Sequence, residues 1–151
     1  MNAIVWTAYG SPDLLQVREI ETPVPGPGEL LVRVHAATVL AGDCELRRAE
    51  FPALYWLPIR LMMGITRPRD KVLGQEFSGM VETVGEGVTR FEPGDEILGT
   101  TGFRMGAWAE FVCLPASSPL VKKPAGMSHA EAAALPVGGS NALHFLEKAG
   151  S

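Results

Sequence analysis

Glycine and proline divide this chain into short pieces. The 17 glycines and 12 prolines among its 151 residues are spread along the whole sequence instead of being gathered in one tract. Proline fixes φ and removes a backbone donor, while glycine permits tight turns. Short segments separated by such turn signals are typical of an all-β unit with tight connections. The pattern therefore predicts a mainly β fold.

Between these breaks lie short runs that are β-branched or alternate between apolar and polar residues. In the clearest of them, Leu30, Val32 and Val34 share one face, while Leu31, Arg33 and His35 share the other and more polar face. On that face we expect His35 to be solvated or bonded locally and not to bind a metal. The expected strands cover Ala3–Ala8, Leu14–Ile20, Glu29–Val39, two segments within Phe77–Gly99, and Ala107–Leu114.

A few helices are expected beside the strands. We expect a short helix over Gly42–Glu50, with Asp43 as a candidate cap at its start. Ser128–Leu135 begins with Ser128 and carries Glu131 three residues later, which is a capping box. We expect Pro136 to end this helix and a last helix to cover Ser140–Gly150.

Composition excludes several classes of function. The formal net charge is -4 and no basic stripe is present, which disfavours nucleic acid as a partner. Cys44 and Cys113 are not a disulfide framework, and two such cysteines suit a reducing compartment. We read no signal peptide at the N-terminus. The most apolar segment, Phe51–Ile65, is too short to span a bilayer and contains Pro58. We expect a cytoplasmic protein without a membrane partner.

Five runs follow one another along the chain: PVPGPGELLVRVHAATV, Gly42–Asp43, VLGQEFSGMVETVGEGVTRFEPGDEILG, GAWAEFVCLP and LVKKPAGMSHAEAAALPVGGSNALHFL. Their order resembles the GroES-like catalytic domain of the medium-chain dehydrogenase/reductase superfamily. That resemblance implies a bent, partly open β-barrel with short helices over residues 1–125. It also implies that residues 126–151 form a helical connector into a nucleotide-binding Rossmann domain.

The usual Rossmann domain is lacking from this sequence. No G-x-G-x-x-G motif follows a strand, and Gly85–Arg90 reads as a hairpin turn and not as a phosphate-binding loop. We expect the missing domain to act as a partner, in cis or in trans. Alone, this chain is expected to be inactive and to bind neither NADP nor NAD.

By the same resemblance, two positions that hold zinc ligands in related alcohol dehydrogenases carry Leu40 and Gln75. An aliphatic chain and a neutral amide cannot replace a thiolate and an imidazole around zinc. The four-cysteine lobe of the structural zinc is also missing, and Cys44 and Cys113 lack ligand spacing. We expect no metal, which disfavours a zinc alcohol dehydrogenase fragment.

The resemblance points instead to the zinc-free branch, whose members reduce quinones, enones or similar carbonyl compounds with NAD(P)H. It implies catalytic candidates Thr38, Asp43, Gln75 and Glu76, with Asn141 contacting the nicotinamide. Each catalytic candidate also has a structural interpretation. Asp43 could only cap its helix, Gln75 could fill the space of the absent ligands, and Glu76 could pair with backbone donors or an arginine. The arginines considered are Arg47, Arg48, Arg60, Arg67 and Arg69.

The apolar segment Phe51–Ile65 has two interpretations. It could be a lipophilic wall beside the cleft for a hydrophobic carbonyl substrate, or a loop that packs on the core. Exposure of part of it would favour self-association as a homo-oligomer. We expect His129 to lie on the surface. The rival to the enzyme hypothesis is a GroES-like binding module without catalysis.

Overall fold

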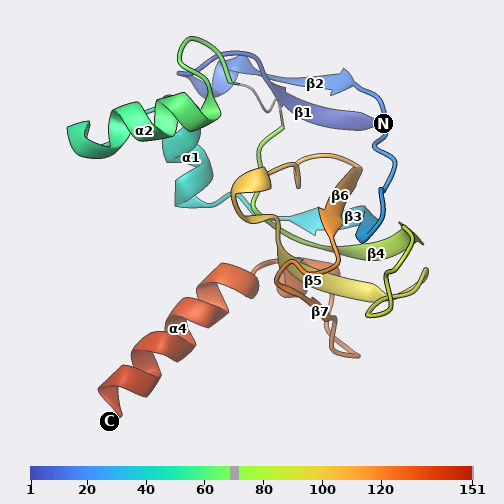
Figure 1. Ribbon diagram of the computed structural model, residues 1–151. Helices are drawn as coiled ribbons and strands as arrows, with labels where there is room; N and C mark the ends of the chain where they lie inside the picture. The colour runs from blue at the N-terminus through green and yellow to red at the C-terminus, as the bar shows by residue number, and fades with distance from the viewer. Residues whose placement is uncertain (69–71, 151) are drawn as a thin grey trace.

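The computed structural model describes residues 1–68 and 72–150, which form two antiparallel sheets and four α-helices (Figure 1). A two-stranded sheet pairs β1 with β2, and a five-stranded sheet has the order β6-β3-β4-β5-β7. The mainly β fold with short helices is confirmed, and in the described part of the chain the two sheets do not close into a barrel. The strands are β1 (Asn2–Trp6), β2 (Leu15–Glu19), β3 (Glu29–Ala37), β4 (Glu76–Val84), β5 (Glu96–Thr100), β6 (Phe111–Pro115) and β7 (Leu120–Lys122).

The alternation predicted for β3 is confirmed from Val32 onward, whereas Leu31, which was expected on the more polar face, is buried beside a shift in the register with β4. Val32 is fully buried, whereas Arg33 and His35 are exposed. β3 pairs with β4 on one side and β6 on the other, so it is an interior strand of the five-stranded sheet. The main core is a cluster of Leu30, Val32, Phe77, Val81, Phe91, Ile97, Ala107, Val112, Leu114 and Leu120.

Two glycines allow backbones to approach closely. A Cβ on Gly79 in β4 would lie 2.2 Å from the carbonyl oxygen of Arg33 in β3. A Cβ on Gly85, where the chain turns after β4, would lie 1.9 Å from the carbonyl oxygen of Gly26. Both distances are too short for any side chain, so the sheet requires glycine here.

The strand expected over Ala107–Leu114 was too long. The backbone N–H groups of Ala107 and Trp108 donate to Gly74 and Leu73, so this part crosses toward the start of β4 and β6 begins only at Phe111. The short strand β7 was not predicted. It has three residues, too few for a visible alternation.

The apolar segment forms a helix that was not predicted. α1 (Ala41–Arg48) lies where a short helix was expected, and α2 (Ala53–Met63) follows with Pro58 inside it. Two side chains of its second half pack into the protein: Met63 joins a cluster with Trp6, Leu73 and Met105, and Ile59 packs against that cluster. Packing on the core therefore explains a small part of the segment. The large exposed side chains of this region are Leu54, Tyr55, Trp56, Leu57, Leu61, Met62 and Ile65.

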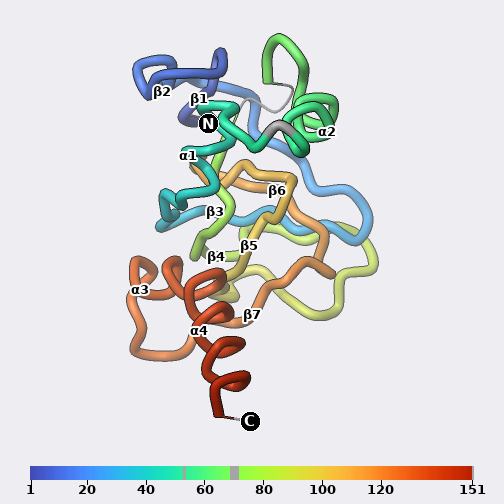
Figure 2. The backbone as a smooth tube through the Cα atoms, turned by 90° about the vertical axis from the view of Figure 1, so that its left-hand side faces the viewer, coloured from blue at the N-terminus to red at the C-terminus, as the bar shows by residue number. Residues whose placement is uncertain are grey.

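The capping box before α3 (His129–Ala133) is confirmed. The backbone N–H of Ser128 donates to the Glu131 carboxylate at 2.9 Å, and the N–H of Glu131 donates to Ser128 Oγ at 3.3 Å. Pro136 does not end this helix but begins the next, α4 (Pro136–Ala149), because the first turn of a helix needs no N–H there. α4 projects from the body in both views (Figures 1 and 2). Among the described residues, no helix is both long and apolar enough to cross a bilayer.

Candidate functional site

Glu76, the first residue of β4, stands at the centre of the candidate site. Its side chain is 1% exposed. The carboxylate accepts a hydrogen bond from Thr38 Oγ1 at 2.6 Å and another from the backbone N–H of Val137 at 2.5 Å. Glu76 therefore joins the end of β3 to the first turn of α4.

The arginine partner considered for Glu76 was wrong within the described residues, whereas the backbone donor was right. Arg47 donates to the carbonyl of Gly10, and Arg60 donates to that of Ile65. Arg48 makes its ion pair with Glu50. Arg69 lies outside the described residues. The Glu76 carboxylate is thus held by one hydroxyl and one backbone N–H.

Asp43 and Gln75 form the second contact of the site. Asp43 is fully buried, accepts from the backbone N–H of Leu40 at 3.0 Å, and lies 3.4 Å from the donating Nε2 of Gln75. Burial raises the pKa of Asp43, hydrogen bonds from Leu40 and Gln75 oppose this, and the nearby charge of Glu76 adds to it. Asp43 does cap α1, but from its third position, because Leu40 is the N-cap residue.

The backbone of Gln75 is fixed by a residue that the sequence did not point to. The N–H of Thr101 donates to the carbonyl of Gln75 at 2.8 Å, and Thr101 Oγ1 donates to that of Gly74 at 3.0 Å. Thr101 follows β5, so the end of that strand fixes the backbone from which the Gln75 side chain reaches Asp43. A lone threonine has no sequence signal for such a role.

The structure brings four of the five predicted site residues together. Thr38 contacts Glu76, Gln75 contacts Asp43, and Gln75 and Glu76 are neighbours in the chain. Asn141 is exposed on α4, one turn beyond Val137. The nicotinamide contact of Asn141 stays a prediction.

The chemistry of the donors around Gln75 does not suit zinc. Leu40 offers no ligand atom, and Gln75 uses its amide nitrogen on Asp43. In residues 1–68 and 72–150, no group of three or more histidine, cysteine, aspartate or glutamate side chains is placed to hold a metal ion. Such groups would be needed for a structural or catalytic zinc site.

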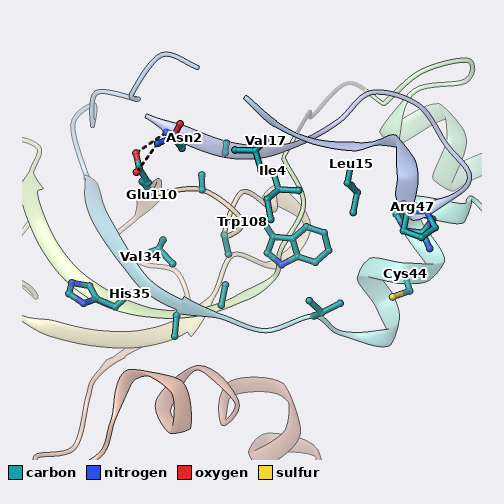
Figure 3. Close-up of a pocket in the computed structure, with 17 residues that line it drawn as sticks. Asn2, Ile4, Leu15, Val17, Val34, His35, Cys44, Arg47, Trp108 and Glu110 are labelled. Carbon is teal, nitrogen blue, oxygen red and sulfur yellow. Dashed lines mark hydrogen bonds between the residues drawn. The ribbon is translucent and has the colours of Figure 1, made fainter. Parts of the chain in front are cut away.

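A separate apolar pocket of about 690 Å³ lies between the β1–β2 hairpin, β3 and α1 (Figure 3). The Trp108 indole stands inside it, and its Nε1 donates to the carbonyl of Thr38 at 2.8 Å. Val39 and Cys44 line the pocket, whereas Asp43, Gln75 and Glu76 do not. The pocket therefore borders the residues on either side of Thr38, but the polar cluster lies outside it.

Residues 26–125 match the family model of the alcohol dehydrogenase GroES-like domain. The chain belongs to this family. Within it, the chain has the fold and motif order of the medium-chain dehydrogenase/reductase superfamily. Several of its relatives and structural neighbours carry names of oxidoreductases.

The relatives are much longer than this GroES-like chain. It is 34% identical over 145 residues to a quinone oxidoreductase of Pseudomonas aeruginosa, covering 96% of the chain and 40% of that protein. It is 39% identical over 138 residues to a synaptic vesicle membrane protein VAT-1 homolog of Danio rerio, covering 90% of the chain and 25% of that protein. The structure of the quinone oxidoreductase from Coxiella burnetii superposes on this chain with a TM-score of 0.82 at 29% identity. The match covers 98% of this chain and 44% of that protein.

Proposed function

We propose that this GroES-like chain is the substrate-domain portion of a zinc-independent oxidoreductase that reduces quinones, enones or related carbonyl compounds by hydride transfer from NAD(P)H. The observation that carries the proposal is the polar cluster around Gln75 and Glu76. It brings together the side chains that the resemblance names, yet the two positions that would bind zinc hold Leu40 and an amide already bonded to Asp43. The quinone oxidoreductases among its relatives support the same class of reaction.

The residues of the site have separate roles in this proposal. Asp43 orients the Gln75 amide, which keeps a second N–H to donate to a substrate oxygen. A donor aimed at an oxygen that gains charge stabilises the transition state. Glu76 and Thr38 hold α4 at the rim of the site through Val137.

A bound NAD(P)H supplies the hydride. The exposed Asn141 amide can donate to and accept from a carboxamide, so it fits the nicotinamide end of the cofactor. The turn after Gly85 fits no phosphate, because its backbone closes a hairpin from Gly85 to Val88. In this proposal a nucleotide-binding domain outside these residues binds the pyrophosphate, and the chain alone is inactive. A reducing, cytoplasmic location would suit this chemistry.

The decisive experiment measures NADPH oxidation by two proteins. One is the 151-residue chain, and the other is the full protein encoded by the reading frame that contains it. We would supply a panel of quinones and enones, with and without a strong zinc chelator. We expect turnover only by the longer protein, without effect of the chelator, and a Gln75→Leu variant with lower kcat. A lack of turnover with every acceptor, or turnover abolished by the chelator, would refute the proposal.

The exposed apolar surface of α2 favours one alternative, a binding module without catalysis. Leu54 and Leu57 are 78% and 54% exposed, and such a surface is suited to contact with another molecule. The same assay separates the two hypotheses, because a binding module would show no turnover in either form.

A further inference from the structure

The apolar pocket of Figure 3 has no role in the proposed reaction. Its volume of about 690 Å³ is in the range of sites that bind small organic molecules. The walls are mainly aliphatic, and three of their side chains, Ile4, Val17 and Val39, are 38%, 75% and 69% exposed. Such a concentration of exposed apolar surface in a hollow favours a ligand with an apolar body.

One end of this pocket carries a buried cation. Arg47 of α1 lines the pocket beside Cys44 (Figure 3) and is only 5% exposed. In the described part of the chain, its guanidinium donates to the carbonyl of Gly10 alone and forms no ion pair. Asp43, one turn earlier in α1, is bonded to Gln75 instead. Burial of a cation without a counter-ion is costly, so the remaining N–H groups of Arg47 are suited to an anion.

The opposite end of the pocket carries a negative charge, that of Glu110 (Figure 3). Its carboxylate accepts from the backbone N–H of Asn2 at 2.7 Å and from Asn2 Nδ2 at 3.1 Å. These two bonds, the backbone bond first, lower the pKa of Glu110 and keep it ionised at neutral pH. An anion is therefore repelled at this end and attracted at the end of Arg47, which sets the direction in which an amphipathic molecule would lie.

The β3 wall of the pocket is held by contacts outside it. His35 of β3 lines the pocket, and its ring stacks on His129 of α3 with centroids 4.4 Å apart. The side chain of His129 is 20% exposed and lies 2.8 Å from Ser78 Oγ in β4 and 3.1 Å from a Glu96 carboxylate oxygen in β5. The expectation that His129 is a surface residue was therefore wrong. These contacts fix β3 against its neighbours, so this wall is in place before a ligand binds.

We propose that the pocket binds a fatty carboxylate, with the carboxylate on Arg47 and the alkyl chain between the β1–β2 hairpin and β3. The planar guanidinium matches a carboxylate in shape and charge. The mainly aliphatic walls suit an alkyl chain better than a sugar or a peptide, which would need more hydrogen-bonding groups. This site does not depend on the proposed function, and its test needs neither NADPH nor an acceptor.

Isothermal titration calorimetry of the 151-residue chain would compare three ligands at neutral pH, below their micellar concentrations. We expect saturable binding of dodecanoate. Decanoate, which buries two fewer CH₂ groups, should bind roughly tenfold more weakly. Dodecylammonium keeps the alkyl chain but reverses the charge, so it should bind at least about tenfold more weakly than dodecanoate. NMR with dodecanoate should place the shifted amide signals at Ile4 and Val34.

Two variants test the residues of the pocket. In Arg47→Gln the affinity for dodecanoate should fall at least about tenfold. The matched control is Arg48→Gln, which removes an exposed arginine from the same helix and should bind like the wild type. If Arg47→Gln does not fold, Val17→Glu provides the second test, because it places a negative charge on an exposed part of the wall and should weaken the binding of dodecanoate.

Five results would overturn the proposal. Dodecanoate does not bind, or dodecylammonium binds equally well. The shifted amide signals gather on α2 instead of the pocket. Arg47→Gln binds dodecanoate as tightly as Arg48→Gln, or Val17→Glu keeps the wild-type affinity.

Discussion

The strongest test of the site concerns Glu76, whose carboxylate joins Thr38 to Val137. In Glu76→Ala both donors lose their acceptor. A hydrogen bond to a charged group contributes about 1.5–3 kcal/mol, so two such bonds amount to about 3–6 kcal/mol. The buried carboxylate itself costs desolvation, which offsets part of this sum. We therefore expect Glu76→Ala to lower the free energy of unfolding by about 2–4 kcal/mol.

Glu76→Gln separates shape from charge. The amide keeps the shape of the side chain, its oxygen can accept from Val137, and its nitrogen can donate to Thr38 Oγ1. It also removes a negative charge close to buried Asp43. These gains offset the loss of charge-assisted bonds, so we expect a cost of under about 1 kcal/mol.

The free energies would be measured by urea unfolding, together with hydrogen exchange of the Val137 amide. The control is Glu147→Ala, which removes an exposed carboxylate from α4 and should change stability by no more than about 0.5 kcal/mol. The reasoning is refuted if Glu76→Ala matches this control. Equal large losses in Glu76→Ala and Glu76→Gln would show that the charge, and not the pair of acceptors, holds the site.

Three further predictions rest on other residues. Burial raises the folded pKa of Asp43, so the free energy of unfolding of the wild type should fall as pH rises through the folded pKa. Urea unfolding measured from pH 4 to pH 7 should show a smaller fall in Asp43→Asn. Gly79→Ala should cost about 2–3 kcal/mol because its Cβ would meet the Arg33 carbonyl; Gly138→Ala, with nothing within 4 Å, should be neutral or stabilising by up to about 1 kcal/mol in the same denaturation assay. Burial, followed by Glu29, raises the pKa of Cys113 to about 11, so mass spectrometry should find slow iodoacetamide labelling of Cys113 at pH 8 in the folded chain and fast labelling in urea.

Local signals in the sequence predicted most of the β framework. The alternation in β3 and the capping box before α3 depend on neighbouring residues, and such patterns can be read directly. α2 was missed because its side chains are apolar around most of the helix and Pro58 interrupts it, so neither periodicity nor a cap marked it. Pro136 was misread because proline can end one helix or begin the next.

The candidate site was predictable in its residues but not in its connections. Thr38, Asp43, Gln75 and Glu76 were named from the resemblance to the family, and the structure brings them into contact. The partner of Glu76 in α4 is a backbone N–H, which any residue except proline would provide, so no sequence signal could identify Val137. The contacts of His129 come from three strands, and only the tertiary fold brings these together.

The hydrogen bond from Trp108 to the Thr38 carbonyl gives the chain a built-in optical reporter. The three tryptophans lie at different depths: Trp6 is fully buried, Trp108 is half-buried, and Trp56 is 42% exposed. Aqueous quenchers should therefore dim Trp56 first and Trp6 last. The Trp108 indole donates to the carbonyl of Thr38, a residue of the polar cluster, so a wavelength change in its emission would signal an event at Thr38 without any attached dye.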